Sequence, residues 1–149
     1  MADPNPLDLR GILAELRDTN KDKRRTAVMK LGMMGGDDAI RNLILIVDNE
    51  YEDLIVRGRA ALMLGRLGDS RAVGPLIRAL EAPGYQITLN AVQSLGNLGD
   101  ARAVAPLMHI AETGKDRLRD AALAALKQLG VEPVPVLNNR ETIEPEPEN

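Results

Sequence analysis

Apolar residues recur at helical spacing along most of the chain. Between residues 56 and 67 they stand at i, i+4, i+7, i+8 and i+11, a stripe formed by Val56, Ala60, Met63, Leu64 and Leu67. An α-helix brings positions with this spacing onto one face. Similar stripes follow over residues 87–98 and 118–129. The pattern predicts amphipathic helices that each bury one face, and therefore an all-α fold.

Two segments of the chain have nearly the same sequence. LGRLGDSRAVGPLIRAL runs from Leu64 to Leu80, and LGNLGDARAVAPLMHIA runs from Leu95 to Ala111. Three columns recur at steps of 31 to 33 residues, namely Leu31, Leu64, Leu95 and Leu126; Gly35, Gly68, Gly99 and Gly130; and Ala27, Ala60, Ala91 and Ala122. A fixed period of this size predicts a series of stacked units that share one continuous core.

Each unit is predicted to contain two helices joined by a tight turn. The first helix carries the apolar stripe and ends at a glycine, Gly68 or Gly99, because glycine adopts the left-handed C-terminal conformation at low cost. The aspartate that follows, Asp69 or Asp100, offers a side-chain oxygen to the start of the next helix. The turn therefore contains both a stop signal and a start signal.

The second helix of each unit is predicted from the position of a proline. Pro75 and Pro106 are tolerated only in a first helical turn. We therefore expect irregular turns at 70–73 and 101–104, followed by regular helix from about residues 74 and 105. Pro83-Gly84 and Gly114 are expected to stop these helices.

These landmarks resemble a known family. The segment VRGRAALMLGRLGDSRAVGPLIRAL (Val56–Leu80) resembles a HEAT repeat of the short phycobilisome-lyase-like type in its V-R, A-x-x-x-L-G, G-D and A-V-x-P-L positions. The next unit matches almost as well, although Thr88 replaces the arginine. The first unit departs further, with Lys23 and Asn42 at the positions of Val56 and Pro75. The resemblance covers roughly residues 21–130.

The resemblance implies an α-solenoid, an alpha-alpha superhelix of about three and a half HEAT-like helix pairs with an N-terminal capping helix. We expect the repeat domain to span 1–130, with the cap over 6–18, begun by Asn5-Pro6 and covering part of the second helix of the first unit. The repeats are expected over about 21–52, 53–84, 85–114 and 115–130. Residues 131–149 form an acidic, proline-rich tail, expected to be partly disordered, whose first valines either pack on the last helix or leave it open.

Composition narrows the classes of function. There is no cysteine, which excludes disulfides and thiol chemistry, and there is no Phe or Trp. No apolar run reaches transmembrane length, and the N-terminus lacks signal-peptide character. Residues 131–149 hold five glutamates against one arginine, so the remainder is close to neutral and does not predict nucleic-acid binding. We expect a soluble, cytoplasmic protein without a membrane partner.

Candidate chemistry is sparse. His109 is the single histidine, and it cannot build a metal or general-base site alone. The acidic pairs at 37–38 and 52–53 are interpreted as helix caps and solvated turns. The basic run NKDKRR (Asn20–Arg25) is interpreted as a solvated helix start, because no aromatic side chain accompanies it to stack on a base. We therefore expect no catalytic residues, no metal and no cofactor.

Two charged columns suggest a structural ladder. Arg24, Arg57 and Arg119 occupy one column, and aspartates lie at the turns at 37, 69 and 100. We expect each arginine to pair with a neighbouring turn aspartate and so to align the units. Exposed pairs of this kind contribute about 1 kcal/mol or less each.

The surface left by stacking is the predicted site of function. The second helices are expected to line the concave face, where equivalent outward positions differ from unit to unit. The candidate binding residues are Arg41, Leu45, Asp48, Arg71, Arg78, Glu81, Arg102, His109 and Glu112. Leu45 and Arg78 are the expected anchors of a partner protein.

The sequence therefore favours a non-enzymatic protein–protein interaction scaffold or adaptor. Two alternatives stay open. The repeat subtype implies a bilin lyase subunit or a phycobiliprotein chaperone, although the chain is short and poor in aromatic side chains that would grip a tetrapyrrole. The other alternative is a structural subunit of a larger assembly, with the tail as a tether.

Overall fold

The computed structural model of the chain describes residues 8–132, and these residues form helices without a strand. The α-helices of this range are α1 Leu9–Glu15, α2 Lys21–Met34, α3 Gly36–Asp48, α4 Leu54–Leu67, α5 Val73–Ala79, α6 Tyr85–Leu98, α7 Val104–Thr113 and α8 Asp116–Gln128. Two short 3-10 helices, η1 Ser70–Ala72 and η2 Ala101–Ala103, precede α5 and α7. The predicted all-α fold is confirmed.

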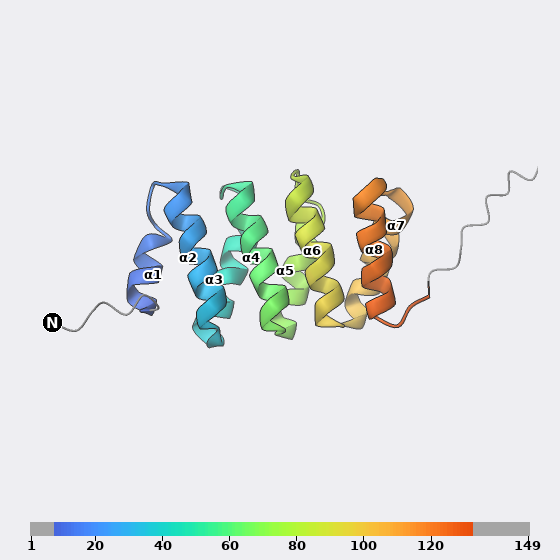
Figure 1. Cartoon of the computed structure of the whole chain (residues 1–149), viewed down its shortest axis with the longest axis horizontal. Helices are drawn as coiled ribbons and strands as arrows, with labels where there is room; N and C mark the ends of the chain where they lie inside the picture. The colour runs from blue at the N-terminus through green and yellow to red at the C-terminus, as the bar shows by residue number, and fades with distance from the viewer. Residues whose placement is uncertain (1–7, 133–149) are drawn as a thin grey trace, which may run out of the picture.

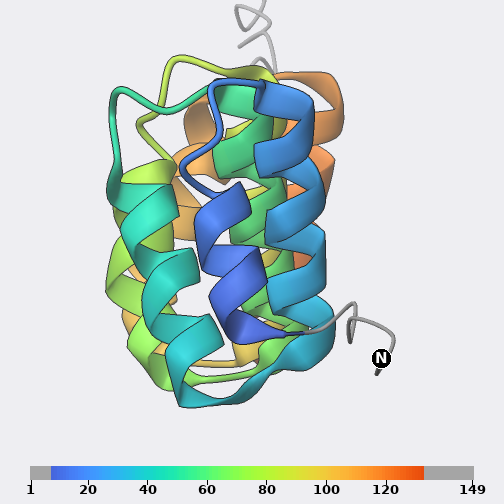
Figure 2. The ribbon, with the colours of Figure 1, turned by 90° about the vertical axis from the view of Figure 1, so that its left-hand side faces the viewer.

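The helices form two layers. The first helices of the units, α2, α4, α6 and α8, stand side by side, and α3, α5 and α7 form the layer behind them (Figure 1). The end view shows both layers edge-on, with α1 across the near end (Figure 2). The core lies between the layers, where the repeated leucine and alanine columns are buried, at most 1% exposed in every unit.

The turn between the two helices of a unit follows the predicted signals. Gly68 ends α4 with φ 71°, in the left-handed conformation, and its backbone N–H donates to the carbonyl of Leu64. The side chain of Asp69 then accepts from the backbone N–H of Arg71. The third unit repeats this geometry at Gly99 and Asp100. The turn itself is a 3-10 helix, so α5 and α7 begin one residue earlier than predicted.

Helix α5 ends before the stop predicted at Pro83-Gly84. Its last residue is Ala79, and Leu80 is the C-cap, so Pro83-Gly84 lies in the connection to α6 and does not itself stop the helix. In the next unit Gly114 is the C-cap of α7, as predicted.

The N-terminal helix is shorter than expected. Asp8 is its N-cap and accepts from the backbone N–H of Gly11, whereas the predicted cap at Asn5-Pro6 lies outside the described residues. Helix α1 packs chiefly against α2 rather than against α3. Ile12 is its buried contact, at 1% exposure, and Glu15 accepts from Lys30 of α2 at 3.1 Å. The helix therefore covers the first-helix side of the end of the stack.

The predicted arginine–aspartate ladder is wrong. Arg24 donates to Glu52, and Arg57 donates to the backbone carbonyl of Val47 at 3.0 Å. The arginines stand in the first turn of each first helix, whereas the turn aspartates follow its last residue. A 14-residue helix separates these ends by about 20 Å. Arg119 is exposed and makes no side-chain bond within residues 8–132.

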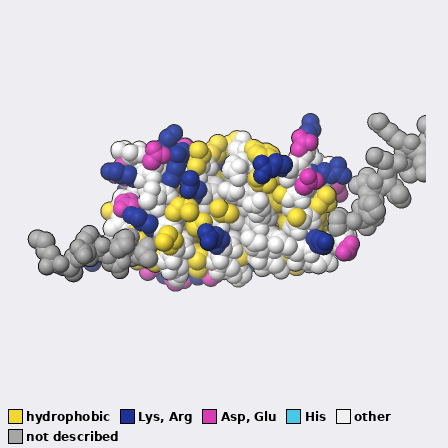
Figure 3. All heavy atoms as spheres, viewed as in Figure 1, with side chains coloured by type: hydrophobic (Ala, Val, Ile, Leu, Met, Phe, Trp, Pro, Cys, Tyr) yellow, Lys and Arg dark blue, Asp and Glu magenta, His cyan; other side chains and the backbone are white. Residues whose placement is uncertain are grey.

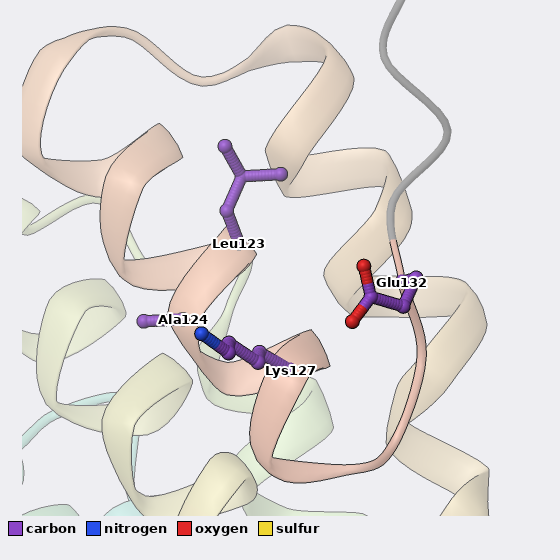
Figure 4. Close-up of a pocket in the computed structure, with 4 residues that line it drawn as sticks. All are labelled: Leu123, Ala124, Lys127 and Glu132. Carbon is purple, nitrogen blue, oxygen red and sulfur yellow. The ribbon is translucent and has the colours of Figure 1, made fainter.

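Within residues 8–132, the last helix presents an open face. Leu123 lies in the column of Val28, Ala61 and Val92, which are completely buried, yet it is only half-buried. With Ala124, Lys127 and Glu132 it lines an open hollow of about 340 Å³ (Figure 4). Val131 packs against the core. The other tail valines expected to pack there lie outside the described residues.

Candidate functional site

The predicted binding residues lie on the outside of the second-helix layer. They come from α3, from the 3-10 turns, from α5 with the residues that follow it, and from α7. All nine are exposed, namely Arg41, Leu45, Asp48, Arg71, Arg78, Glu81, Arg102, His109 and Glu112. We call these residues the second-helix face.

Near the turns, the arginines of this face are held by aspartates. Asp37, at the start of α3, accepts from both Arg41 and Arg71, so it links the first unit to the second. The hydrogen bond from Arg71, and then that from Arg41, holds the pKa of Asp37 below its usual value. Arg71 also donates to Asp69 at 3.0 Å, which lowers the pKa of that carboxyl and raises the pKa of the guanidinium. These groups neutralise one another.

The predicted anchor Arg78 is likewise paired. Its Nε and Nη2 atoms donate to the two carboxylate oxygens of Asp48 at 3.1 and 2.9 Å. This bidentate geometry holds the guanidinium flat across the junction between α3 and α5 and raises the pKa of Arg78. In the third unit Arg102 binds Asp100 and reaches the carbonyl of Ser70 at 3.3 Å.

The remaining residues of the face present free side chains. Leu45 is 68% exposed although it is apolar. Glu81, His109 and Glu112 make no side-chain hydrogen bond or ion pair within residues 8–132. The face is thus a mixture of one exposed apolar side chain, neutralised ion pairs and single polar groups. Such a face can contact the surface of another molecule.

The described residues show neither a metal-ligand cluster nor a membrane-spanning helix. Residues 8–132 hold no group of three or more potential ligands placed to bind a metal ion. The two arginines of the basic run at residues 20–25 are paired internally, because Arg24 binds Glu52 and Arg25 binds Asp22 and Asp53. A phosphate would have to compete with these carboxylates. Over the same range no helix is both long and apolar enough to cross a bilayer.

Sequence reasoning missed exposed side chains on the opposite layer. Met33 is 72% exposed and Ile55 is 49% exposed, and Tyr51, in the connection before α4, is almost entirely so. The positions of Met33 and Ile55 carried a signal, because they fall outside the stripe that each first helix buries. The buried polar groups had no such signal. Asn90 donates to the carbonyl of Gly58 and Ser94 to that of Ala61, at 2.9 and 2.7 Å across the α4–α6 junction.

Comparison with known proteins agrees with this architecture. The family model for HEAT repeats matches residues 9–87 and 52–127. A solved structure, the complex of CpcE and CpcF of phycocyanin lyase from Nostoc sp. PCC7120, is similar, with 28% sequence identity and a TM-score of 0.71 over 87% of this chain. The match spans 56% of that longer chain. No curated protein matches.

The two family matches together cover every helix from α1 to α7 and nearly all of α8. The matched residues include the repeated leucine and alanine columns and the glycines at 35, 68 and 99. On sequence and on structure, the chain belongs to the HEAT-repeat family.

Proposed function

We propose that this protein is a non-enzymatic interaction scaffold that binds a partner protein on the second-helix face. The observation that carries the proposal is that the buried columns repeat from unit to unit, whereas the exposed side chains above them differ. Equivalent positions hold Leu45, Arg78 and His109 in successive units, while the columns beneath them stay leucine and alanine. A stack that presents a different exposed side chain at each step can recognise an extended or helical partner.

Leu45 is the expected energetic centre of this face. It is the large apolar side chain of the face that the stack leaves exposed, and burial of a leucine side chain contributes about 1.5 to 3 kcal/mol. Arg78 is expected to fix the orientation of the partner, because Asp48 already holds the guanidinium of Arg78 in place. A partner that accepts hydrogen bonds from the free edge of the guanidinium would not have to order this side chain.

The proposal is tested with the variant Leu45→Asp/Arg78→Glu. Circular dichroism should show unchanged helical content, because both side chains are exposed. Capture of the partner from native lysate by the full chain should fall at least tenfold. Arg117→Glu, at an exposed position on α8 in the opposite layer, is the control and should leave capture unchanged. Undiminished capture by the double variant would remove this face from consideration.

The similarity to the CpcE–CpcF complex supports a second candidate, a bilin lyase subunit or phycobiliprotein chaperone. That structure is a complex of two proteins, so it is also consistent with a protein partner. The two functions differ in one measurable property. A lyase subunit should alter the visible spectrum of phycocyanobilin on mixing, whereas a scaffold that binds only protein should not.

A further inference from the structure

The layer formed by α2, α4, α6 and α8 carries a surface that differs in charge from the second-helix face. Positions i, i+4, i+7 and i+11 of α4 point away from the core, and they alternate between apolar and basic residues. Ile55, Arg59 and Arg66 are exposed, and Leu62 is half-buried. We call these four residues the α4 stripe. An apolar–basic alternation on an exposed helix face is unlike the neutralised pairs of the second-helix face.

The two arginines of the α4 stripe are unpaired within the described residues. Neither Arg59 nor Arg66 makes a hydrogen bond or an ion pair with any group in 8–132. The sequence explains why, because α4 contains three arginines and no acidic residue and α6 contains no charged residue. On the other side of α4, Asp22 of α2 is paired with Arg25 of its own helix. By contrast, Arg41, Arg71 and Arg78 in the second-helix layer each have a carboxylate partner.

The apolar part of the surface extends beyond α4. Helices α2 and α4 pack side by side, and the 33-residue step sets Met29 beside Leu62 and Met33 beside Arg66. Met33 is 72% exposed, and methionine adapts its shape to a bound surface. Figure 3 shows apolar and basic side chains together over this part of the molecule, with the acidic side chains displaced toward the two ends of the stack.

We propose that the α4 stripe, with Met33, binds an acidic segment of another protein, one that carries two carboxylates about 10 Å apart on either side of an aliphatic side chain. The spacing follows from the helix, because Arg59 and Arg66 are seven residues apart and each residue advances 1.5 Å. The carboxylates would pair with the two guanidiniums. The aliphatic side chain would lie against Leu62 and Met33.

Charge complementarity favours an acidic segment over a neutral apolar segment on the α4 stripe. A neutral apolar segment would bury Arg59 and Arg66 without partners, which costs free energy. An acidic segment supplies the missing acceptors, and arginine pairs with carboxylate through two parallel hydrogen bonds. The surface is separate from the second-helix face, so this inference does not depend on the proposed function.

The test uses the full chain and a blocked, alanine-based helical peptide of 18 residues. The peptide carries two glutamates seven positions apart with leucine between them, and its twin carries glutamine at both positions. We expect the glutamate peptide to shift the methyl NMR signals of Met33 and Ile55 and to bind about tenfold more tightly than its twin, the effect expected of two exposed ion pairs. Arg59→Gln/Arg66→Gln should remove this difference.

The control variant is Arg117→Gln/Arg119→Gln on α8, which removes the same charge from two other exposed arginines without side-chain partners in 8–132. It should bind the glutamate peptide like the unmodified chain. Equal binding of the two peptides, equal loss in the control, or no saturation at millimolar peptide would overturn the proposal. So would a role for Arg59 and Arg66 only in self-association or in binding to vesicles that contain anionic lipid.

Discussion

At the scale of single residues, a glycine in each of the first three first helices sets how closely the units approach. A Cβ atom on Gly65 would lie 2.7 Å from the Cα atom of Ser94, and one on Gly96 would lie 2.9 Å from the Cβ atom of Ala125. Both contacts cross to the next first helix. Because the neighbouring atoms belong to backbone or to Cβ, they cannot rotate away, and the helices themselves would have to separate.

Substitution of Gly65 by alanine should therefore destabilise the protein although alanine favours helix. We expect the free energy of unfolding in urea to fall by about 1 to 3 kcal/mol, the usual cost of overpacking. Gly74→Ala is the matched control, because the nearest atom to its added Cβ is the end of the flexible Arg78 side chain at 3.6 Å. That variant should be neutral or more stable by up to about 1 kcal/mol. Equal losses in both variants would contradict the close-approach explanation.

The sequence predicts some of these residue roles and misses others. Burial of Ala60 and Leu64 follows from periodicity, because a column repeated in every unit must face the shared core. Burial of Arg57, at 7% exposure, does not follow. Its partner is the backbone carbonyl of Val47, and a carbonyl left free at a helix end has no sequence signature of its own.

At the scale of helices, the turns were predictable because each carries its own signals. Glycine stops a first helix and aspartate starts the next, so η1 and η2 appear where the motif recurs. The first unit lacks the motif after Gly35, and there α2 passes directly into α3. The ion pairs that join elements were less predictable. Asp37 binds Arg71 of the next unit, a contact that only the stacking geometry brings together.

These pairs predict how stability depends on pH. The pKa values of Asp37 and Asp69 lie below the ordinary value of 3.8, because hydrogen bonds from arginine stabilise the carboxylates in the folded chain. The unfolded chain therefore binds protons more readily, so this stabilisation is complete above about pH 5 and is lost as the pH falls through the folded pKa. We expect the urea midpoint to decrease between about pH 5 and pH 3.

Asp37→Asn separates this contribution from that of the other carboxylates. The variant should be less stable than the unmodified chain at pH 7, and the two should converge as the pH falls through the folded pKa of Asp37, where its carboxylate becomes protonated. The measurement is urea unfolding followed by circular dichroism across the pH range. A stability difference that grows on acidification would show that Asp37 does not stabilise the folded chain through its charge.

At the scale of the whole molecule, the two outer faces differ in charge although the units repeat. The arginines of the second-helix face are neutralised by Asp48 and by aspartates at the nearby turns, whereas those of the α4 stripe have no acidic partner within residues 8–132. The sequence indicated the first face as the variable surface, because its columns change between units. It did not indicate the second, because the absence of acidic partners around Arg59 and Arg66 is a property of neighbouring helices and not of any column.

The stack also predicts how the molecule opens. Within residues 8–132, α4 and α6 have a first helix packed on each side, whereas α8 has one on one side only, and α1 covers the other end through Ile12. In a repeat array stability comes largely from contacts between neighbours, so amide hydrogen exchange should be slowest in α4 and α6 and faster in α1 and α8. Ile12→Ala should accelerate exchange in α1 and α2 well before it affects α6. Uniform acceleration in every helix, measured by mass spectrometry, would instead show that the units open together, and that the contacts between them are strong enough to override the local loss at the end.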